Sequence, residues 1–250
     1  MTSPVPGTPA PAVLRAAAIL DVISKHADIY PRVSEIARAT GIPHSSVTNV
    51  LAALVETGLV RRAGSGYSIG PTTVELASVF LRSDDTVQRF REFVPDMETL
   101  SAETVQLGTL VEGDVLFLAR HDGAQPIALT SAIGKRLPAS STAIGKAMLA
   151  RLEPPELTAT LSEPLPQLTD RSHRDLATLS DDLAGIRRRG HAMDNEEAAP
   201  NVVCIAVAVD TPEGEPRCAI STTLFKDRLT PELRDRLVAD LTAVASYLAK

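Results

Sequence analysis

The amino-acid sequence predicts an α+β protein of two domains, a small, largely helical one and a larger one of grouped strands and helices. The first observation is a change of pattern and of charge near Gly70. Residues 12–70 carry six Lys/Arg against four Asp/Glu, whereas residues 71–250 carry 19 against 27. The second is that short strand-like runs follow one another in the larger region instead of alternating with helices. That order is typical of an α+β domain and not of a doubly wound sheet.

Composition limits the classes of protein that this chain can form. Its 250 residues are 44% hydrophobic, enough for one large core or two modest ones. Residues 1–11 are predicted to be a disordered tail. They lack the basic and apolar segments of a signal peptide, and no later run is apolar enough to span a membrane, which favours the cytoplasm. Two cysteines favour a reducing compartment. We therefore expect a cytoplasmic protein without membrane association, cofactor or metal.

Two helices are predicted before residue 42. Over residues 13–24 a single apolar stripe recurs at helical spacing. Over residues 33–40 a second stripe is followed by Gly41, which favours the left-handed conformation that ends a helix. The residues expected to pack are Val13, Ala16, Ala17, Leu20 and Ile23 in the first helix, and Val33, Ile36, Ala37 and Thr40 in the second.

A third helix is predicted from His44, after the turn Gly41-Ile42-Pro43. Its two faces differ in chemistry, because helical geometry separates an apolar set from a set of small polar residues. Short hydrogen-bonding side chains at the start of such a helix are those that reach base edges in the major groove. The apolar set is Val47, Val50, Leu51 and Leu54, and the exposed set is Ser45, Thr48, Asn49, Ala52 and Glu56.

Residues 59–70 alternate around Gly64-Ser65-Gly66, which predicts a β-hairpin. Arg61 and Arg62 precede its tip and are candidates for phosphate contacts. Three helices followed by such a hairpin indicate a winged helix-turn-helix. The alternatives are that this region is only a structural domain, and that its arginines are ordinary surface residues.

The second region begins with a predicted linker helix at 71–83 whose apolar residues Val74, Ala77, Phe80 and Leu81 suit packing on a partner. A further helical pattern at 88–103 contains Pro95 and should be kinked or split there. Strand-like runs are expected at 105–111, 115–121, 126–131, 202–209 and 217–224, and helices at 172–190 and 230–249.

Known catalytic motifs are missing from the sequence. Neither Gly-Lys pair has the glycine and hydroxyl of a phosphate-binding loop, and there is no Gly-x-Ser-x-Gly elbow. Cys204 with His191 is conceivable as a nucleophile and base, but Cys204 in an apolar strand suits a buried small hydrophobe better. The run Arg187-Arg188-Arg189 suits a helix C-terminus before Gly190 better than DNA binding.

Hydroxyls and small residues at 139–150 lead into a helix, so its free N–H groups are candidates for holding a carboxylate. The alternative is an ordinary N-cap on a closely packed helix.

The chain resembles the IclR family of bacterial transcriptional regulators from Ala12 to Lys250. The resemblance rests on VLRAAAILDVI, EIARATGIPHSSVTNVLAALVETGLV and YSIG in the first region. In the second it rests on GKRLPASSTAIGKAMLA, GHAMDNEEAAPNVVCIAVAV and RCAISTT. It implies a winged helix-turn-helix at 12–70, a linker helix at 71–87, and a GAF-like effector-binding domain at 88–250 with an antiparallel sheet and flanking helices. It also implies a homodimer or homotetramer.

The resemblance assigns candidate residues to both sites. Two departures concern DNA reading, because members commonly carry Lys and Arg where this chain has His44 and Asn49. Two others concern the pocket, because Asn201 and Ala208 stand where Gly and Pro are common. The DNA-binding candidates are Arg15, His44, Ser45, Ser46, Thr48, Asn49, Arg61 and Arg62. The effector-binding candidates are Leu137, Thr142, Ala143, Ile144, Asp194, Val202, Cys204, Ser221 and Thr223.

Some of these candidates have structural alternatives. Asp194 would equally cap a turn, Ser221 and Thr223 would equally be hydrogen-bonded strand residues, and Asn49 would equally face solvent or a phosphate. The expected function is a regulator without catalysis that binds double-stranded operator DNA, responds to a small organic acid and controls a catabolic or metabolic operon. The alternative is an enzyme that converts a small carboxylate and is tethered to DNA.

Overall fold

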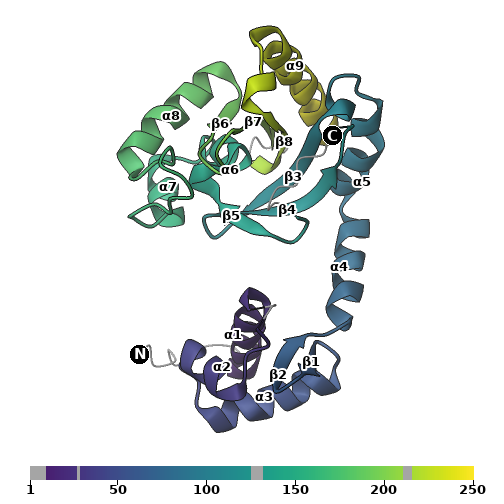
Figure 1. Ribbon diagram of the computed structural model, residues 1–250, viewed down its shortest axis with the longest axis vertical. Coiled ribbons are helices and arrows are strands. Elements are labelled where there is room, and N and C mark those ends of the chain that lie inside the picture. The colour runs from purple at the N-terminus through teal and green to yellow at the C-terminus, as the bar shows by residue number, and fades with distance from the viewer. Residues whose placement is uncertain (1–9, 27–28, 125–131, 211–215) are drawn as a thin grey trace. The chain divides into compact units, whose positions relative to one another are not determined.

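The computed structural model describes residues 10–26, 29–124, 132–210 and 216–250, and the chain divides into two compact units between Ser83 and Asp84. The first unit holds α1 to α4 and a two-stranded sheet, and the second holds a six-stranded sheet with its helices (Figure 1). The predicted strand at 126–131 and most of the predicted tail lie outside the described residues. Among the described helices, none is long and apolar enough to cross a membrane.

Three helices of the first unit form one apolar core. The helices are α1 (Pro11–Lys25), α2 (Val33–Thr40) and α3 (His44–Glu56), and their buried residues include Ile36, Val47 and Leu51. The predicted helix end at Gly41 is confirmed, since Gly41 has φ 69° and its N–H donates to the carbonyl of Ala37 at 2.9 Å. The turn and the start of α3 at His44 are also as predicted.

The predicted stripe of α1 is wrong in two of its members. Val13 is 65% exposed and Ala17 is exposed, whereas Ile19, which was outside the stripe, is fully buried with Ile23. Ile19 and Ile23 are four residues apart and therefore share a face, while Val13 and Ala17 lie more than about 100° around the helix from Ile19. The two bulky isoleucines set the buried face.

The predicted hairpin is confirmed. β1 (Val60–Ala63) pairs antiparallel with β2 (Gly66–Ile69), and Gly64, with φ 56°, helps form the turn. The hairpin packs closely on the loop before α2, because a Cβ on Gly66 would lie 1.8 Å from the carbonyl oxygen of Tyr30. Glycine is therefore required at that position.

The linker helix agrees with the residue pattern at 71–83, and it is shorter than the linker of 71–87 that the resemblance implied. α4 (Thr72–Ser83) ends before Asp84, whose side chain accepts the N–H groups of Thr86 and Val87 and so begins α5 (Asp85–Phe93). The predicted interruption at Pro95 is confirmed, because α5 gives way there to short 3-10 turns. These turns are η1 (Val94–Asp96) and η2 (Leu100–Ala102).

The second unit is built on an antiparallel sheet in the order β5-β4-β3-β8-β7-β6. Alternate residues of each strand face opposite sides of a sheet. On β7, Ala206 and Ala208 belong to the core beneath α6, whereas Val203, Ile205 and Val207 alternate with them, and α9 also packs on β7. The strands are β3 (Thr104–Val111), β4 (Asp114–His121), β5 (Arg136–Pro138), β6 (Ala192–Asn195), β7 (Val202–Asp210) and β8 (Pro216–Phe225).

The remaining helices flank this sheet. Several are as predicted, but α8 begins after Asp175, whose carboxylate accepts the N–H of Thr178 at 2.8 Å, so it starts later than residue 172. β5, β6 and α7 were not predicted, because three, four and seven residues are too few for a periodic pattern to stand out. The helical segments are η3 (Ala139–Ser141), α6 (Ala143–Leu149), α7 (Pro154–Thr160), α8 (Leu176–Arg189), η4 (Lys226–Arg228) and α9 (Pro231–Leu248).

Candidate functional site

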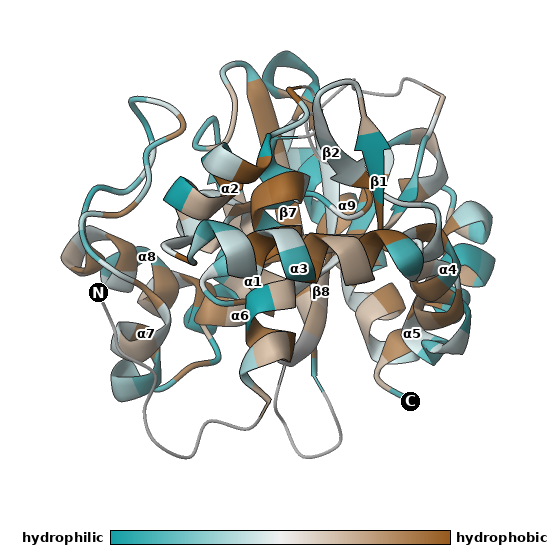
Figure 2. Ribbon diagram, turned by 90° about the horizontal axis from the view of Figure 1, so that it is seen from below, coloured by the Kyte–Doolittle hydropathy of each residue, from teal (hydrophilic) through white to brown (hydrophobic). Residues whose placement is uncertain are grey.

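The first unit carries exposed polar side chains along α3 and on the hairpin. Ser45, Thr48 and Asn49 are exposed along α3 and His44 is exposed at its start, while Ser46 is half-buried. β1 contacts α3, and Figure 2 shows the hydrophilic β1 beside that helix. Most of the DNA-binding candidates therefore lie on α3 and β1.

The three candidate arginines differ from one another in their surroundings. Arg62 lies over the ring of Tyr67, its Cζ atom 5.5 Å from the ring centroid, and this cation–π contact limits its freedom. Arg61 is exposed on β1, and Arg15 is exposed on α1 and not on α3 or β1. Arg32 was not a candidate from the sequence, but its Nε donates to the hydroxyl of Ser65 at 3.2 Å and so holds the hairpin tip.

The second unit contains a cavity between α6 and the sheet with an empty volume of ≈ 450 Å³, part of it open to solvent. Its lining includes every effector-binding candidate from the sequence: Leu137, Thr142, Ala143, Ile144, Asp194, Val202, Cys204, Ser221 and Thr223. It also includes Gln106, Phe117, Ala198 and Ala199, which were not candidates. Residues from α6 and from all six strands of the sheet thus meet at one hollow.

Thr142 and the strand hydroxyls have protein partners as well as a place at the cavity. The hydroxyl of Thr142 accepts the N–H of Gly145 at 3.1 Å, so the N-cap alternative describes this residue correctly. The hydroxyl of Thr223 lies 3.3 Å from the thiol of Cys204 and donates to the amide oxygen of Gln106 at 3.3 Å. This chain of contacts orients polar groups along one side of the cavity.

Asp194 is the acidic group of the cavity, and it is also a turn cap. Its Oδ1 atom accepts the N–H groups of Glu197 at 2.7 Å and Ala198 at 3.2 Å. The side chain is almost completely buried. Burial and the nearby charge of Glu197 raise the pKa of Asp194 to about 7, against the opposing effects of the two N–H groups and Lys146.

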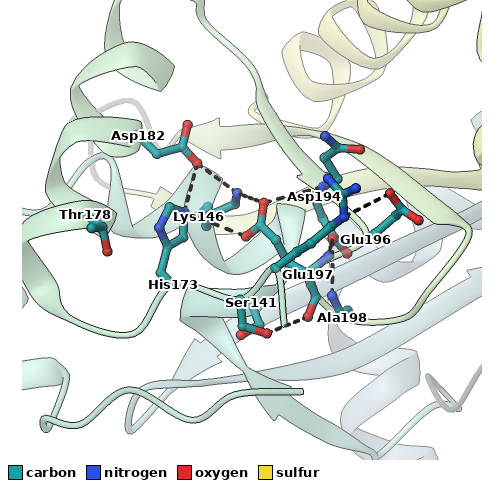
Figure 3. Close-up of polar contacts among 12 residues, drawn as sticks. Ser141, Lys146, His173, Thr178, Asp182, Asp194, Glu196, Glu197 and Ala198 are labelled. Carbon is teal, nitrogen blue, oxygen red and sulfur yellow. Dashed lines mark hydrogen bonds and ion pairs between the residues drawn. The ribbon is translucent and has the colours of Figure 1, made fainter. Parts of the chain in front are cut away.

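A buried ionic cluster is joined to Asp194 through Glu197, whose N–H bonds to Asp194 and whose side chain contacts Lys146. The ammonium of Lys146 contacts Glu197 Oε1 at 2.5 Å and Asp182 Oδ2 at 2.8 Å, and Figure 3 shows His173 beside the same two acids. The Nε2 atom of His173 lies 3.5 Å from Asp182 Oδ2 and 3.8 Å from Glu197 Oε2. Burial would raise the pKa of Asp182, but hydrogen bonds from His173, Lys146 and Arg189 and the charge of Lys146 hold it well below its usual range.

This cluster was not predicted from the sequence. His173, Asp182 and Glu197 bring potential metal-ligand atoms within 4.8 Å of one another, although the histidine spacing in the sequence gave no such signal. Lys146 already supplies the positive charge that those carboxylates require. A lysine within the apolar run AIGKAMLA was the available signal, because a buried cation needs buried acids.

The arrangement does not suit nucleophilic catalysis by Cys204. Burial, followed by the charge of Asp194, raises the pKa of the thiol well above its ordinary value, so the reactive thiolate is disfavoured. Cys204 pairs with Asp194 across β6 and β7, whereas His191 does not line the cavity.

Asn201 and Ala208 are the two positions near the cavity at which this chain departs from the family pattern. Asn201 has φ 60°, a left-handed conformation that explains why glycine is common there and that asparagine tolerates. Ala208 does not line the cavity. Arg187 bonds to the carbonyls of Ala150 and Leu152 at the end of α6, so this member of the basic run caps a neighbouring helix and not its own.

Comparison with known proteins identifies both units. Residues 12–64 match the IclR helix-turn-helix domain, and residues 79–250 match the family described as bacterial transcriptional regulator IclR C-terminal. The HTH-type transcriptional regulator BhcR of Paracoccus denitrificans is 34% identical over 212 residues, which cover 84% of this chain and 75% of BhcR. The acetate operon repressor of Salmonella typhimurium is 28% identical over 224 residues, which cover 87% of this chain and 80% of the repressor.

Among solved structures, an IclR transcriptional regulator from Alicyclobacillus acidocaldarius shares the fold with a TM-score of 0.83, at 21% identity over 96% of this chain and 97% of the other. The matching family models and the relatives named here are regulators of transcription, and they give no support to the alternative of a tethered enzyme. This chain belongs to the IclR family of bacterial transcriptional regulators.

Proposed function

We propose that this regulator reads double-stranded operator DNA with the start of α3 and the hairpin, and that a small organic acid in the cavity controls that binding. The observation that supports the proposal best is that the nine candidate residues, which come from distant parts of the sequence, line one hollow. The relative named as an acetate operon repressor supports a metabolic operon as the target. A ligand acts on DNA binding only through different affinities for two states of the protein.

DNA reading is assigned to the exposed side of α3. Asn49 is exposed one turn after Ser45, and the first helical turns of a recognition helix are those that meet base edges. An asparagine pairs best with adenine N6 and N7, whereas an arginine would pair with guanine O6 and N7, each contact contributing about 1–3 kcal/mol of discrimination. We therefore expect an adenine opposite Asn49 in each half-site.

The experiment is selection of operators from random DNA with the wild type and with Asn49→Arg. A change from adenine to guanine at one symmetric pair of positions supports base reading by Asn49. Ala39→Arg adds the same charge to an exposed position of α2 and controls for general attraction to DNA. The same selected sequences from wild type and Asn49→Arg would show that Asn49 does not read a base.

A homo-oligomer is proposed from the surface of α4. No residue of this helix is buried, and four large apolar side chains are more than half exposed: Val74, Leu76, Val79 and Phe80. Leu76, Val79 and Phe80 lie within about 100° of one another around the helix, whereas Val74 lies apart from them. An apolar side of a helix is covered in most stable proteins, and two copies of a helix-turn-helix match the two-fold symmetry of paired half-sites. The apolar set differs from the predicted one in including Leu76 and Val79, while Leu81 is half-buried.

A further inference from the structure

The cavity contains an acidic side chain, but its lining residues, all of which the structure describes, include no Lys, Arg or His. Asp194 supplies the carboxyl group, and the other polar lining groups are hydroxyls, a thiol and an amide. Because Asp194 is only 1% exposed, water screens its charge weakly. An anionic ligand in this cavity therefore meets another carboxyl group without a lining cation to offset the repulsion.

The cation of the neighbouring cluster is already engaged. Lys146 is fully buried, and its ammonium lies between Glu197 and Asp182, at 2.5 Å and 2.8 Å from their oxygens. Asp182 also contacts Arg189 at 3.1 Å, and His173 lies within 4 Å of both acids. Lys146 lowers the pKa of Asp194 only as a minor, more distant influence.

The other groups that face Asp194 are uncharged or acidic. The turn after β6 gives two N–H donors to its Oδ1 atom, and the side chain of Glu197 adds a negative charge. From β7, Cys204 is paired opposite Asp194, and its thiol is held protonated by burial. From β8, the hydroxyl of Thr223 contacts that thiol. These elements leave the carboxyl of Asp194 without a strong counter-charge.

Two carboxyl groups that share a buried site keep one proton between them, because two like charges at such a distance cannot both be ionised at acceptable cost. Resting on the function proposed above, we infer that the organic acid is held by one proton shared between its carboxyl group and that of Asp194. The acid enters as an anion, the proton comes from solvent, and no covalent bond is made or broken. Binding at or above neutral pH is therefore coupled to proton uptake.

The electrostatics of Asp194 suit this coupling. Burial, and then the charge of Glu197, raise the pKa of Asp194 to about 7, so the carboxyl is poised to take up a proton near neutral pH. Above that pH each added unit should weaken binding of an acid about tenfold, because one proton must be captured for each ligand. A neutral ligand of the same shape should show no such dependence.

The test is calorimetric titration of the full chain with small monocarboxylates, from acetate and lactate to benzoate, and with the primary amide of each, between pH 5.5 and 8.5. At pH 8, two buffers with different ionisation enthalpies measure the protons taken up. Wild type should take up about one proton per acid and none per amide. Asp194→Asn mimics the protonated carboxyl, so it should bind the same acid with pH-independent affinity and no uptake. Asp181→Asn, the same change at an exposed position of α8, should behave as wild type.

The outcomes separate this inference from the proposed function. If an acid binds wild type without proton uptake at pH 8, or if uptake persists in Asp194→Asn, the shared proton is wrong while the organic-acid site stands. If the amides bind and the acids do not, or if no probe binds, the organic-acid site itself is wrong and the inference fails with it. The buffer comparison on wild type decides the matter even where Asp194→Asn does not fold.

Discussion

Replacing Lys146 with methionine tests the energetic importance of the buried cluster. Methionine keeps much of the length and volume of the lysine side chain but removes its charge. In the wild type the ammonium contacts Glu197 Oε1 at 2.5 Å and Asp182 Oδ2 at 2.8 Å. The change therefore leaves two acids without their cation while it avoids opening a large cavity.

The size of the effect follows from what each acid retains. Asp182 keeps a contact to Arg189 at 3.1 Å, and its side chain is 23% exposed, so it is the less costly of the two. The side chain of Glu197 is 9% exposed and keeps a long contact to the N–H of Asn195 at 3.4 Å. Removing one partner of a buried ion pair costs about 3–5 kcal/mol. We expect a loss near the lower end, about 3 kcal/mol, because one acid is partly solvated.

Amide hydrogen exchange of the full chain is the suitable assay, because exchange in α6 and β6 reports the free energy of opening locally. Glu197→Gln added to Lys146→Met should recover part of the loss, since the uncompensated charge is then gone, and the interaction between the two changes should be about 1–3 kcal/mol.

A loss below about 1 kcal/mol at pH 8 would refute this reasoning, because it would mean that the two acids need no buried cation. Arg151→Met removes the cation of an ion pair between Arg151 and Asp210 that is partly exposed, and it should cost about 1 kcal/mol or less. This control separates the effect of burial from the loss of a charge.

Three further predictions concern DNA, the cavity and assembly. Arg61→Ala with Arg62→Ala should reduce the slope of log affinity against log salt concentration by about two, and an unchanged slope in binding titrations would remove the hairpin from the interface. Thr223→Val and Ala143→Leu should each weaken acid binding about tenfold, one by loss of a hydrogen bond and one by filling space, while DNA binding without acid stays unchanged. A normal response of both variants to the acid would exclude the cavity as its site. Phe80→Glu should lower the mass seen by light scattering, and a wild-type mass of only 26.5 kDa with operator present would contradict oligomerisation.

The first unit could be predicted closely because its signals are local. Helical periodicity, Gly41 and the Gly64-Ser65-Gly66 turn lie within short segments, and each element formed where its own residues indicated. The error in α1 was one of rotation about the helix axis. An alanine-rich helix offers several apolar stripes, and contacts with α2 and α3 decide which one is buried.

The cavity was predicted through family resemblance, and its missing members have a physical explanation. Gln106 lies on β3. This strand pairs with β8 in the sheet, although more than a hundred residues separate the two strands in the sequence. Sequence periodicity gives the two faces of a strand but not its neighbours. The same limit applies to Lys146, whose partners Asp182 and Glu197 are 36 and 51 residues away.

The central claim is that an acid in the cavity controls binding of DNA, and thermodynamic reciprocity gives its most direct test. With a selected operator and an acid found by calorimetry, the Kd of the operator is measured without and with saturating acid. The Kd of the acid is then measured without and with operator. Both ratios should equal the same factor, of about 5–150, and Ala143→Leu should bring both toward one. Ratios of one in both directions for the wild type would show that the acid and the operator bind independently, and would contradict the claim.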